Sequence, residues 1–267
     1  MMRYLFAAIV LIISNSVSAG LKEDALKHVP VSKLIKVTGH PDYPPVVWAA
    51  KGGEELHGVA VELMELAFSE LGVKVKTFNS GTWGRAQEEV KEGRIDILLP
   101  PYQNAERLLV YEYFKNPILK DETVIFVKKG KAFSFKKFED LVGKSGVTII
   151  DDSFGNEFDK FMKEKLKIER LAKTEQCFEF LAKDRAQYMI AGLNAGLAVA
   201  KKNGVEKNFE ILPKRVVMTG MFAPISKKSE WNHPAIHKFI NTRIAAYAKS
   251  GLVKKLENKY WEAYAKE

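Results

Sequence analysis

The regular alternation of strand-like and helix-like segments constrains the fold of this chain more than any other feature of its sequence. Between residues 60 and 71 the apolar side chains recur at three- and four-residue spacing, which predicts an amphipathic helix ended by Gly72. The elements expected in the first part of the chain are strands at 33–38, 73–78 and 94–99 and helices at 60–71 and 83–92. Strands joined through single helices by short connections indicate βαβ units and a mostly parallel sheet, which binds ligands beyond the carboxyl ends of its strands.

A second unit of the same kind follows. Its expected elements are strands at 123–128, 146–150 and 187–191 and helices at 138–142, 153–165 and 176–182. The chain then returns through residues 216–225 to two helices whose apolar stripes lie at 236–247 and 252–261, with Asn232 as the expected N-cap of the first. The length of the chain, 267 residues, suits either two modest lobes or one large domain.

The N-terminus has the three parts of a secretory signal peptide. Arg3 supplies a positive start, the stretch from Leu5 to Ile13 is apolar and uncharged, and Val17-Ser18-Ala19 offers small residues for cleavage. The apolar stretch is short for a membrane span, which favours a cleaved signal at residues 1–19 over a retained anchor. We therefore predict cleavage after Ala19 and a mature protein in the periplasm.

Charge and metal-ligand spacing exclude several classes of function. The net charge of +9 comes from scattered lysine pairs, whereas a nucleic-acid binder would concentrate them on one element, so we expect no nucleic-acid partner. His233 and His237 have the spacing of a zinc pair, but no glutamate follows His233 and Pro234 opens the helix there; we expect no metal and no cofactor. The single Cys177 lies in a helical pattern and is expected to be buried.

Several short motifs follow one another at characteristic spacing along the mature chain. They are Gly58-Val59 before the amphipathic helix, Leu71-Gly72-Val73, Trp83 with its helix, Gly93-Arg94-Ile95-Asp96, Ala105-Glu106-Arg107, Phe114-x-x-Pro117, Leu141-x-Gly143-Lys144, and Lys249-Ser250-Gly251-Leu252 with Lys259-Tyr260-Trp261. In this order they resemble the extracellular solute-binding proteins of family 3, the binding components of polar amino-acid ABC importers.

The resemblance implies an α/β, type II periplasmic-binding-protein-like fold: two lobes with mostly parallel sheets flanked by helices, joined by two hinge crossovers. Lobe 1 would comprise residues 20–118 plus 215–267, lobe 2 residues 123–212, and the hinge residues 119–122 and 213–214. Such lobes close around a ligand only if the ligand contacts both of them.

The resemblance further implies binding of a small polar solute that carries a carboxylate, an amino acid or a related molecule, for delivery to the membrane permease of an ABC importer. We expect a monomer that is not an enzyme. Two alternatives remain open. The loaded protein would instead dock on a membrane receptor as a sensory input, or the cleft would act as a dehydratase, with Asp42, Asp151 or Asp152 as the acid.

Three residues, Arg107, Tyr43 and Trp83, match positions that hold the ligand in this family, and a fourth candidate, Arg85, lies two residues after Trp83. Arg107 would pair with the ligand carboxylate through its planar guanidinium, the alternative being an exposed arginine that pairs with Glu106 or Glu112. Tyr43 and Trp83 would place aromatic rings against the ligand, the alternative being that both belong to the core. Arg85 is either a second anion contact or a surface residue.

The sequence departs from the family pattern in both lobes. Pro100 and Pro101 replace small hydroxyl residues and remove two backbone donors, and Tyr102 and Gln103 offer side-chain donors in their place. In the second lobe, the aspartate that would hold the ligand's amino group falls near Gly192. Either the ligand has no α-amino group, or another acid such as Asp151 or Asp152 supplies the charge. Ser153 is expected to cap the helix that follows and to present its amides to the ligand in the cleft.

Overall fold

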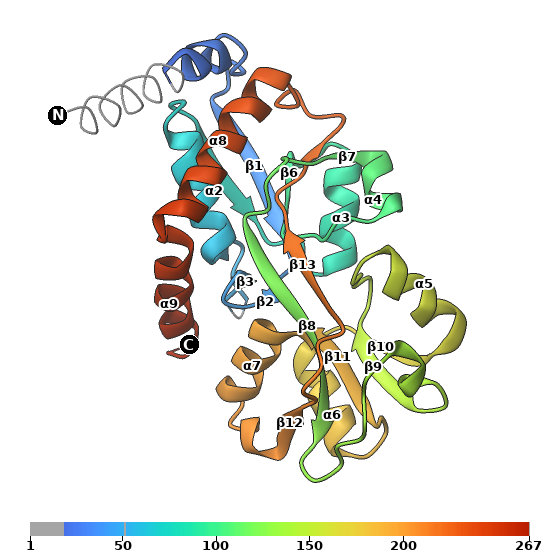
Figure 1. Cartoon of the computed structure of the whole chain (residues 1–267). Helices are drawn as coiled ribbons and strands as arrows, with labels where there is room; N and C mark the ends of the chain where they lie inside the picture. The colour runs from blue at the N-terminus through green and yellow to red at the C-terminus, as the bar shows by residue number, and fades with distance from the viewer. Residues whose placement is uncertain (1–18, 51, 267) are drawn as a thin grey trace, which may run out of the picture.

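The computed structural model describes residues 19–50 and 52–266 and divides into two α/β lobes (Figure 1). All of the predicted signal peptide except Ala19 lies outside these residues. Residues 19–26 form a helix at the outer end of the first lobe. None of the described helices is long and apolar enough to cross a bilayer.

The sheet of the first lobe is parallel at its centre. Its strands, in spatial order, are β5 (Lys74–Phe78), β1 (Leu34–Gly39), β6 (Ile97–Leu99), β14 (Ile225–Ser226) and β7 (Tyr111–Glu112). Successive residues of β6 enter different cores: Ile97 joins the cluster built with α2 (Val59–Ser69) and α8 (Pro234–Ser250), and Leu98 joins the cluster built with α3 (Trp83–Lys91). Helices therefore cover both faces of this sheet.

The second lobe repeats the plan with a mixed sheet. The strands β10 (Lys167–Leu171), β9 (Ser145–Ile149) and β11 (Tyr188–Gly192) are parallel, whereas β8 (Leu119–Lys128) runs antiparallel to β11, β12 (Phe209–Ile211) and β13 (Val217–Met221). The helices of this lobe are α5 (Asn156–Lys165), α6 (Thr174–Ala182) and α7 (Leu193–Lys202), with short 3₁₀ helices at Phe138–Leu141 and Glu206–Asn208. Cys177 of α6 is buried, as predicted.

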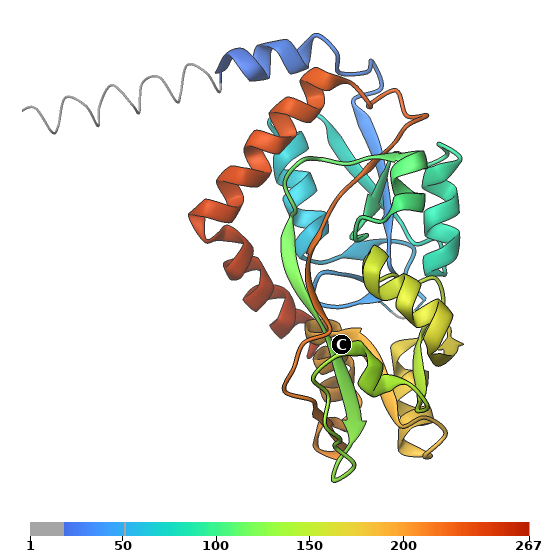
Figure 2. The same cartoon turned by 45° about the vertical axis from the view of Figure 1, so that its right-hand side comes forward.

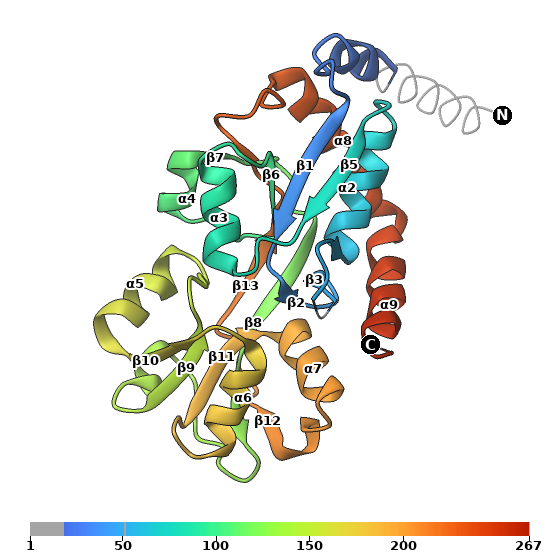
Figure 3. The same cartoon turned by 180° about the vertical axis from the view of Figure 1, so that it is seen from behind.

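Two antiparallel strands carry the chain between the lobes. β8 and β13 pair from Leu119 with Met221 to Thr123 with Val217, and they run side by side from one lobe to the other (Figures 1 and 2). On the outer flank, α9 (Leu252–Tyr264) continues from α8 and its end reaches α7 of the second lobe (Figure 3). The lobes are therefore joined at the crossover strands and touch again at the C-terminal helix.

Two short elements complete the first lobe beside the cleft. One is a small antiparallel sheet of β2 (Asp42–Tyr43), β3 (Val47–Ala49) and β4 (Leu56–His57). The other is the short helix α4 (Ala105–Val110), whose N-cap Asn104 accepts a hydrogen bond from the Arg107 amide. Both elements follow strands of the main sheet and therefore lie at the edge where a ligand is expected.

Two predicted helix caps are wrong. α5 begins at Asn156 rather than at Ser153, and Gly155 occupies its N-cap position. The Ser153 hydroxyl instead donates to Asp159 of the same helix, because the intervening turn leaves the backbone before Asn156 non-helical. At α8 the cap is His233, whose Nδ1 accepts from the Ala235 amide at 3.2 Å, and not Asn232.

Candidate functional site

The cleft lies between α3 and α4 of the first lobe and α5 and β10 of the second. Its outer part is a groove of about 1340 Å³. Its inner part is a cavity of about 20 Å³, enough for a single water molecule. Six predicted ligand residues line this inner cavity: Tyr43, Trp83, Tyr102, Arg107, Asp152 and Ser153. The structure thus brings residues from both lobes to one place in a closed arrangement.

Arg107 is buried at the centre of the cleft, with 6 % of its surface exposed. Its guanidinium donates to Gln87 Oε1 at 3.1 Å, to the Tyr102 carbonyl at 3.1 Å and, across the cleft, to the Asp151 carbonyl at 3.3 Å. These acceptors are all neutral oxygens, so the alternative of an exposed arginine paired with Glu106 or Glu112 is wrong. A buried cation held only by neutral partners is suited to receive an anion.

Trp83 is at once a core residue and a wall of the cavity. Thr82 caps α3 by accepting from the Arg85 amide at 3.2 Å, which sets Trp83 at the first turn of this helix. The indole packs in the core cluster of α3, and its ring centroid lies 5.2 Å from that of His40 and 5.4 Å from the Arg107 guanidinium carbon. The cation thus rests beside an aromatic ring.

The hydroxyls of Tyr43 and Tyr102 meet on the carboxylate of Asp121, a residue that sequence reasoning missed. Each hydroxyl donates to Asp121 Oδ2 at 2.7 Å, and the two phenol oxygens are 3.2 Å apart. Asp121 lies on the crossover strand β8 and is 1 % exposed. Burial raises the pKa values of all three groups, so the tyrosines stay protonated.

Gly192 leaves the space into which this cluster fits. It ends β11 and pairs with Thr123 of β8, two residues from Asp121. A Cβ at position 192 would lie 1.8 Å from the Tyr43 hydroxyl oxygen and 2.5 Å from Asp121 Oδ2. The missing second-lobe side chain is therefore replaced in space by a tyrosine hydroxyl from the first lobe and a carboxylate from the crossover strand.

His40 and Asp152 form an unusual titratable pair on the cavity wall. His40 Nδ1 accepts from the Asp42 amide at 3.0 Å, and its Nε2 lies 3.8 Å from Asp152 Oδ1. Burial and the Arg107 charge lower the pKa of His40 to about 3, so the ring is neutral and carries its proton on Nε2. Burial raises the pKa of the Asp152 carboxyl to about 7.

Hydrogen bonds across the cleft hold the lobes together on the side of α4 and at β2. Asn104 Nδ2 donates to Ser153 Oγ at 3.0 Å, and the Ala105 amide donates to Asn156 Oδ1 at 2.9 Å. The Thr174 amide, at the start of α6, donates to Asp42 Oδ2 at 3.1 Å. A larger ligand can reach the inner cavity only when these contacts separate.

Two predicted ligand residues do not line the inner cavity. The Arg85 side chain is 73 % exposed and lies 4.0 Å from Glu89 on its own helix. Gln103 is exposed beside Tyr102, and neither the cavity nor the groove includes it. Asp151 is also exposed, and only its carbonyl contacts Arg107. Arg85 lies on the exposed side of α3, whereas Gln103 and Asp151 lie in loops beside buried residues, where a sequence pattern does not fix the direction of a side chain.

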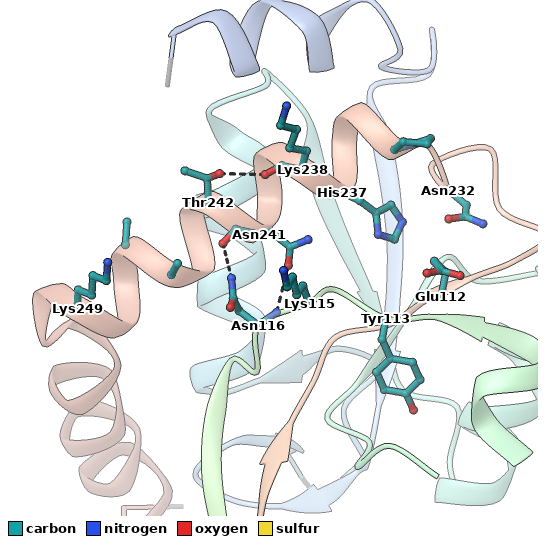
Figure 4. Close-up of a pocket in the computed structure, with 13 residues that line it drawn as sticks. Glu112, Tyr113, Lys115, Asn116, Asn232, His237, Lys238, Asn241, Thr242 and Lys249 are labelled. Atoms are coloured by element: carbon teal, nitrogen blue, oxygen red, sulfur yellow. Dashed lines mark hydrogen bonds between the residues drawn. The ribbon is translucent and has the colours of Figure 1, made fainter. Parts of the chain in front are cut away.

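A second hollow, of about 960 Å³, lies beside α8 on the first lobe alone (Figure 4). Asn116 and Asn241 close part of its floor with hydrogen bonds of 3.0 and 3.2 Å, and Lys238, Thr242 and Lys249 extend from the helix around it. A ligand here would touch one lobe, so it would not favour closure. Within the described ranges, no three potential metal ligands come together.

Comparisons with known proteins identify a family and several structures of the same fold. The model of the bacterial extracellular solute-binding proteins, family 3, matches residues 35–263. No protein of curated function matches the chain. A mutant of ArgBP from T. maritima is similar in structure, with 22 % sequence identity, a TM-score of 0.71, and coverage of 89 % of this chain and 99 % of that one.

Two further structures share the fold. An amino acid ABC transporter substrate-binding protein, AbpA from Streptococcus pneumoniae bound to L-arginine, has 16 % identity, a TM-score of 0.73, and coverage of 90 % of this chain and 100 % of that one. The ancestral amino acid-binding protein AncCDT-1, a precursor of cyclohexadienyl dehydratase, has 22 % identity, a TM-score of 0.69, and coverage of 88 % and 98 %. Both support the predicted two-lobed, type II architecture.

Proposed function

The chain belongs to the bacterial extracellular solute-binding proteins, family 3, and from this membership we propose that it binds a small carboxylate-bearing solute, an amino acid or a related molecule, between its lobes. We further propose that it does so in the periplasm, after cleavage behind Ala19, and that it passes the solute as a monomer to the permease of an ABC importer. Residues 20–118 with 215–267 would move against residues 123–212.

The buried guanidinium of Arg107 is the observation that carries this proposal. It sits where both lobes meet, and its hydrogen bonds go to neutral oxygens only. A carboxylate that replaced the Asp151 carbonyl as its partner would form a charge-assisted, planar contact. His40 Nε2–H, which has no hydrogen-bond partner among the described residues, would be a second donor beside it.

A thermal-shift screen of amino acids, dicarboxylates, polyamines and small aromatic acids tests the proposal. A carboxylate-bearing compound at a hundredfold its Kd should add about 2.7 kcal/mol of stability. Arg107→Ala should weaken the binding of that compound by about thirtyfold or more, since truncating a buried charged partner costs about 2 kcal/mol or more.

Arg94→Ala is the matched control, because Arg94 is exposed and pairs with Glu89 outside the cleft. It should leave the binding of the compound unchanged. An unchanged Kd in Arg107→Ala would remove Arg107 as the anchor. A screen in which no carboxylate-bearing solute binds would remove the proposed function itself.

One observation favours a second candidate, a dehydratase-type enzyme. Asp152 is a buried carboxyl on the cavity wall whose pKa, raised to about 7 by burial, suits a general acid at neutral pH. AncCDT-1, which has a similar fold, is a precursor of such an enzyme. Incubation of each binding compound with the protein, followed by chromatography, separates the two functions: recovery of the intact compound supports binding alone, and loss of water from it would establish an enzyme.

A further inference from the structure

Two tyrosines that line the inner cavity share one buried carboxylate. A tyrosine hydroxyl carries one hydrogen, and in both Tyr43 and Tyr102 that hydrogen is directed to Asp121 Oδ2 at 2.7 Å. Both tyrosines line the cavity, and with both hydroxyls donating to Asp121 their oxygens have only lone pairs left to offer. The two oxygens lie 3.2 Å apart, farther than either lies from Asp121 Oδ2.

Two donors line the same cavity. His40 is neutral and its Nδ1 accepts from the Asp42 amide, so its Nε2 presents a proton. Arg107 adds a permanent positive charge to the lining. The cavity therefore has donors at His40 and Arg107 and acceptors at Tyr43 and Tyr102.

We propose that Asp121, acting through the hydroxyls of Tyr43 and Tyr102, is the specificity-determining counter-charge for a protonated amino group of the ligand. The inference rests on the proposed function and adds to it that the carboxylate-bearing solute is also a cation. One N–H group placed between the two phenol oxygens would bond to both, and the buried carboxylate behind them would balance its charge.

Gly192 makes this arrangement possible. Any side chain at position 192 would collide with the Tyr43 hydroxyl, which would lie 1.8 Å from its Cβ. Tyr43 belongs to β2 of the first lobe and Gly192 to β11 of the second, so the Tyr43 hydroxyl packs against the second lobe in this closed arrangement. The ligand's amino group would contact Tyr43 and Tyr102 of the first lobe and, through them, Asp121 of the crossover strand β8.

The test compares ligands that differ by one protonated amine. The probes are each L-amino acid with the 2-hydroxy acid of the same side chain, and L-lysine with L-norleucine, measured by isothermal titration calorimetry. We expect the wild type to prefer the amine-bearing member of at least one pair by about tenfold or more, because a site that hydrogen-bonds a group rejects the analogue that lacks it. Asp121→Asn and Tyr43→Phe should each reduce that preference to about threefold or less.

Two variants control for the chemistry of the substitutions. Asp96→Asn changes a hydrogen-bonded carboxylate in the first lobe that accepts from Lys36 and Ser229, outside the cleft. Tyr188→Phe removes a buried hydroxyl that has no partner among the described residues. Both should keep the full preference for the amine. If Asp121→Asn does not fold, Tyr43→Phe and Tyr102→Phe provide the same comparison.

Three results would overturn the inference. One is a preference that survives in Asp121→Asn and Tyr43→Phe. Another is a preference that disappears only in Asp152→Asn, which would assign the counter-charge to that residue. The third is a wild type that binds the amine-free carboxylates as tightly as their partners, and in that case the proposed function stands without this inference. Binding of no carboxylate at all would overturn both.

Discussion

At the scale of single residues, His40 and Asp152 titrate in opposite senses. The pKa of His40 is lowered to about 3 in the folded protein because the neutral ring is buried, so the free energy of unfolding decreases as the pH falls below about 6.5. The pKa of Asp152 is raised to about 7 because its protonated carboxyl is buried, so the free energy of unfolding decreases as the pH rises from about 4 towards 7. Between about pH 4 and 6.5 the two effects oppose each other.

Single substitutions should separate these two effects. Asp152→Asn should gain stability relative to the wild type as the pH rises from about 4 to about 7, by up to about 1.4 kcal/mol per pH unit. His40→Gln should lose stability relative to the wild type as the pH rises from about 3 to about 6.5. Urea unfolding at several pH values measures both differences. Parallel curves for wild type and either variant would show that the corresponding residue does not titrate differently on folding.

Sequence patterns predicted some of the residues that line the cleft and missed others. Tyr43, Trp83 and Arg107 were found because each follows or starts a recognisable element in the right order. Asp121 was missed because it lies among polar residues that read as a hinge, and only the approach of two distant tyrosines distinguishes it. Contacts across the cleft join residues up to 132 positions apart, and no local pattern encodes them.

At the scale of elements, the predicted helices and strands agree with the structure where periodicity is strong. The amphipathic pattern at 60–71 became α2, and the strands before and after it lie within a few residues of their predicted positions. β10 was not predicted, because Lys167, Glu169 and Arg170 on this edge strand break the apolar pattern of a strand. β8 is longer than predicted for the same reason, since its polar start resembles a loop.

The hydrogen bond between the N-terminal ends of α4 and α5 leads to a prediction at the scale of elements. Asn156, the first residue of α5, accepts from the Ala105 amide at the start of α4, a backbone donor that its own helix cannot satisfy. Asn156→Ala should favour the open form and weaken ligand binding about fivefold, as expected for one hydrogen bond of about 1 kcal/mol. Calorimetry measures the affinity, and small-angle X-ray scattering measures the radius of gyration of the ligand-free protein.

Asn203→Ala is the matched control for this change. The Asn203 side chain, at the end of α7, donates to the Val199 carbonyl of the same lobe. It should change neither the affinity nor the radius of gyration. Equal affinities in Asn156→Ala and the wild type would mean that this contact does not contribute to closure.

At the scale of the whole molecule, the lobes contact each other on both flanks of the crossover strands. One flank carries the polar contacts of α4 with α5, and the other carries an aromatic cluster at the end of α9. In this cluster, Trp48 and Tyr264 of the first lobe pack with Ala198 of α7, and the Tyr264 ring lies 4.3 Å from Lys202 Nζ. We therefore expect closure to depend on apolar packing outside the cleft as well as on the contacts within it.

Tyr264→Ala tests whether this packing couples the lobes. Tyr264 is 8 % exposed, so its truncation should cost about 3 kcal/mol of unfolding free energy. Because the lost contacts cross between lobes, it should also increase the radius of gyration and weaken ligand binding. Tyr247→Ala is matched to it, since Tyr247 is 9 % exposed on the neighbouring helix α8 and its hydroxyl bonds to Glu70 within the first lobe. That variant should lose similar stability while its affinity and radius of gyration stay unchanged. Equal effects of both variants on affinity would mean that α9 stabilises the first lobe only and leaves closure to the cleft.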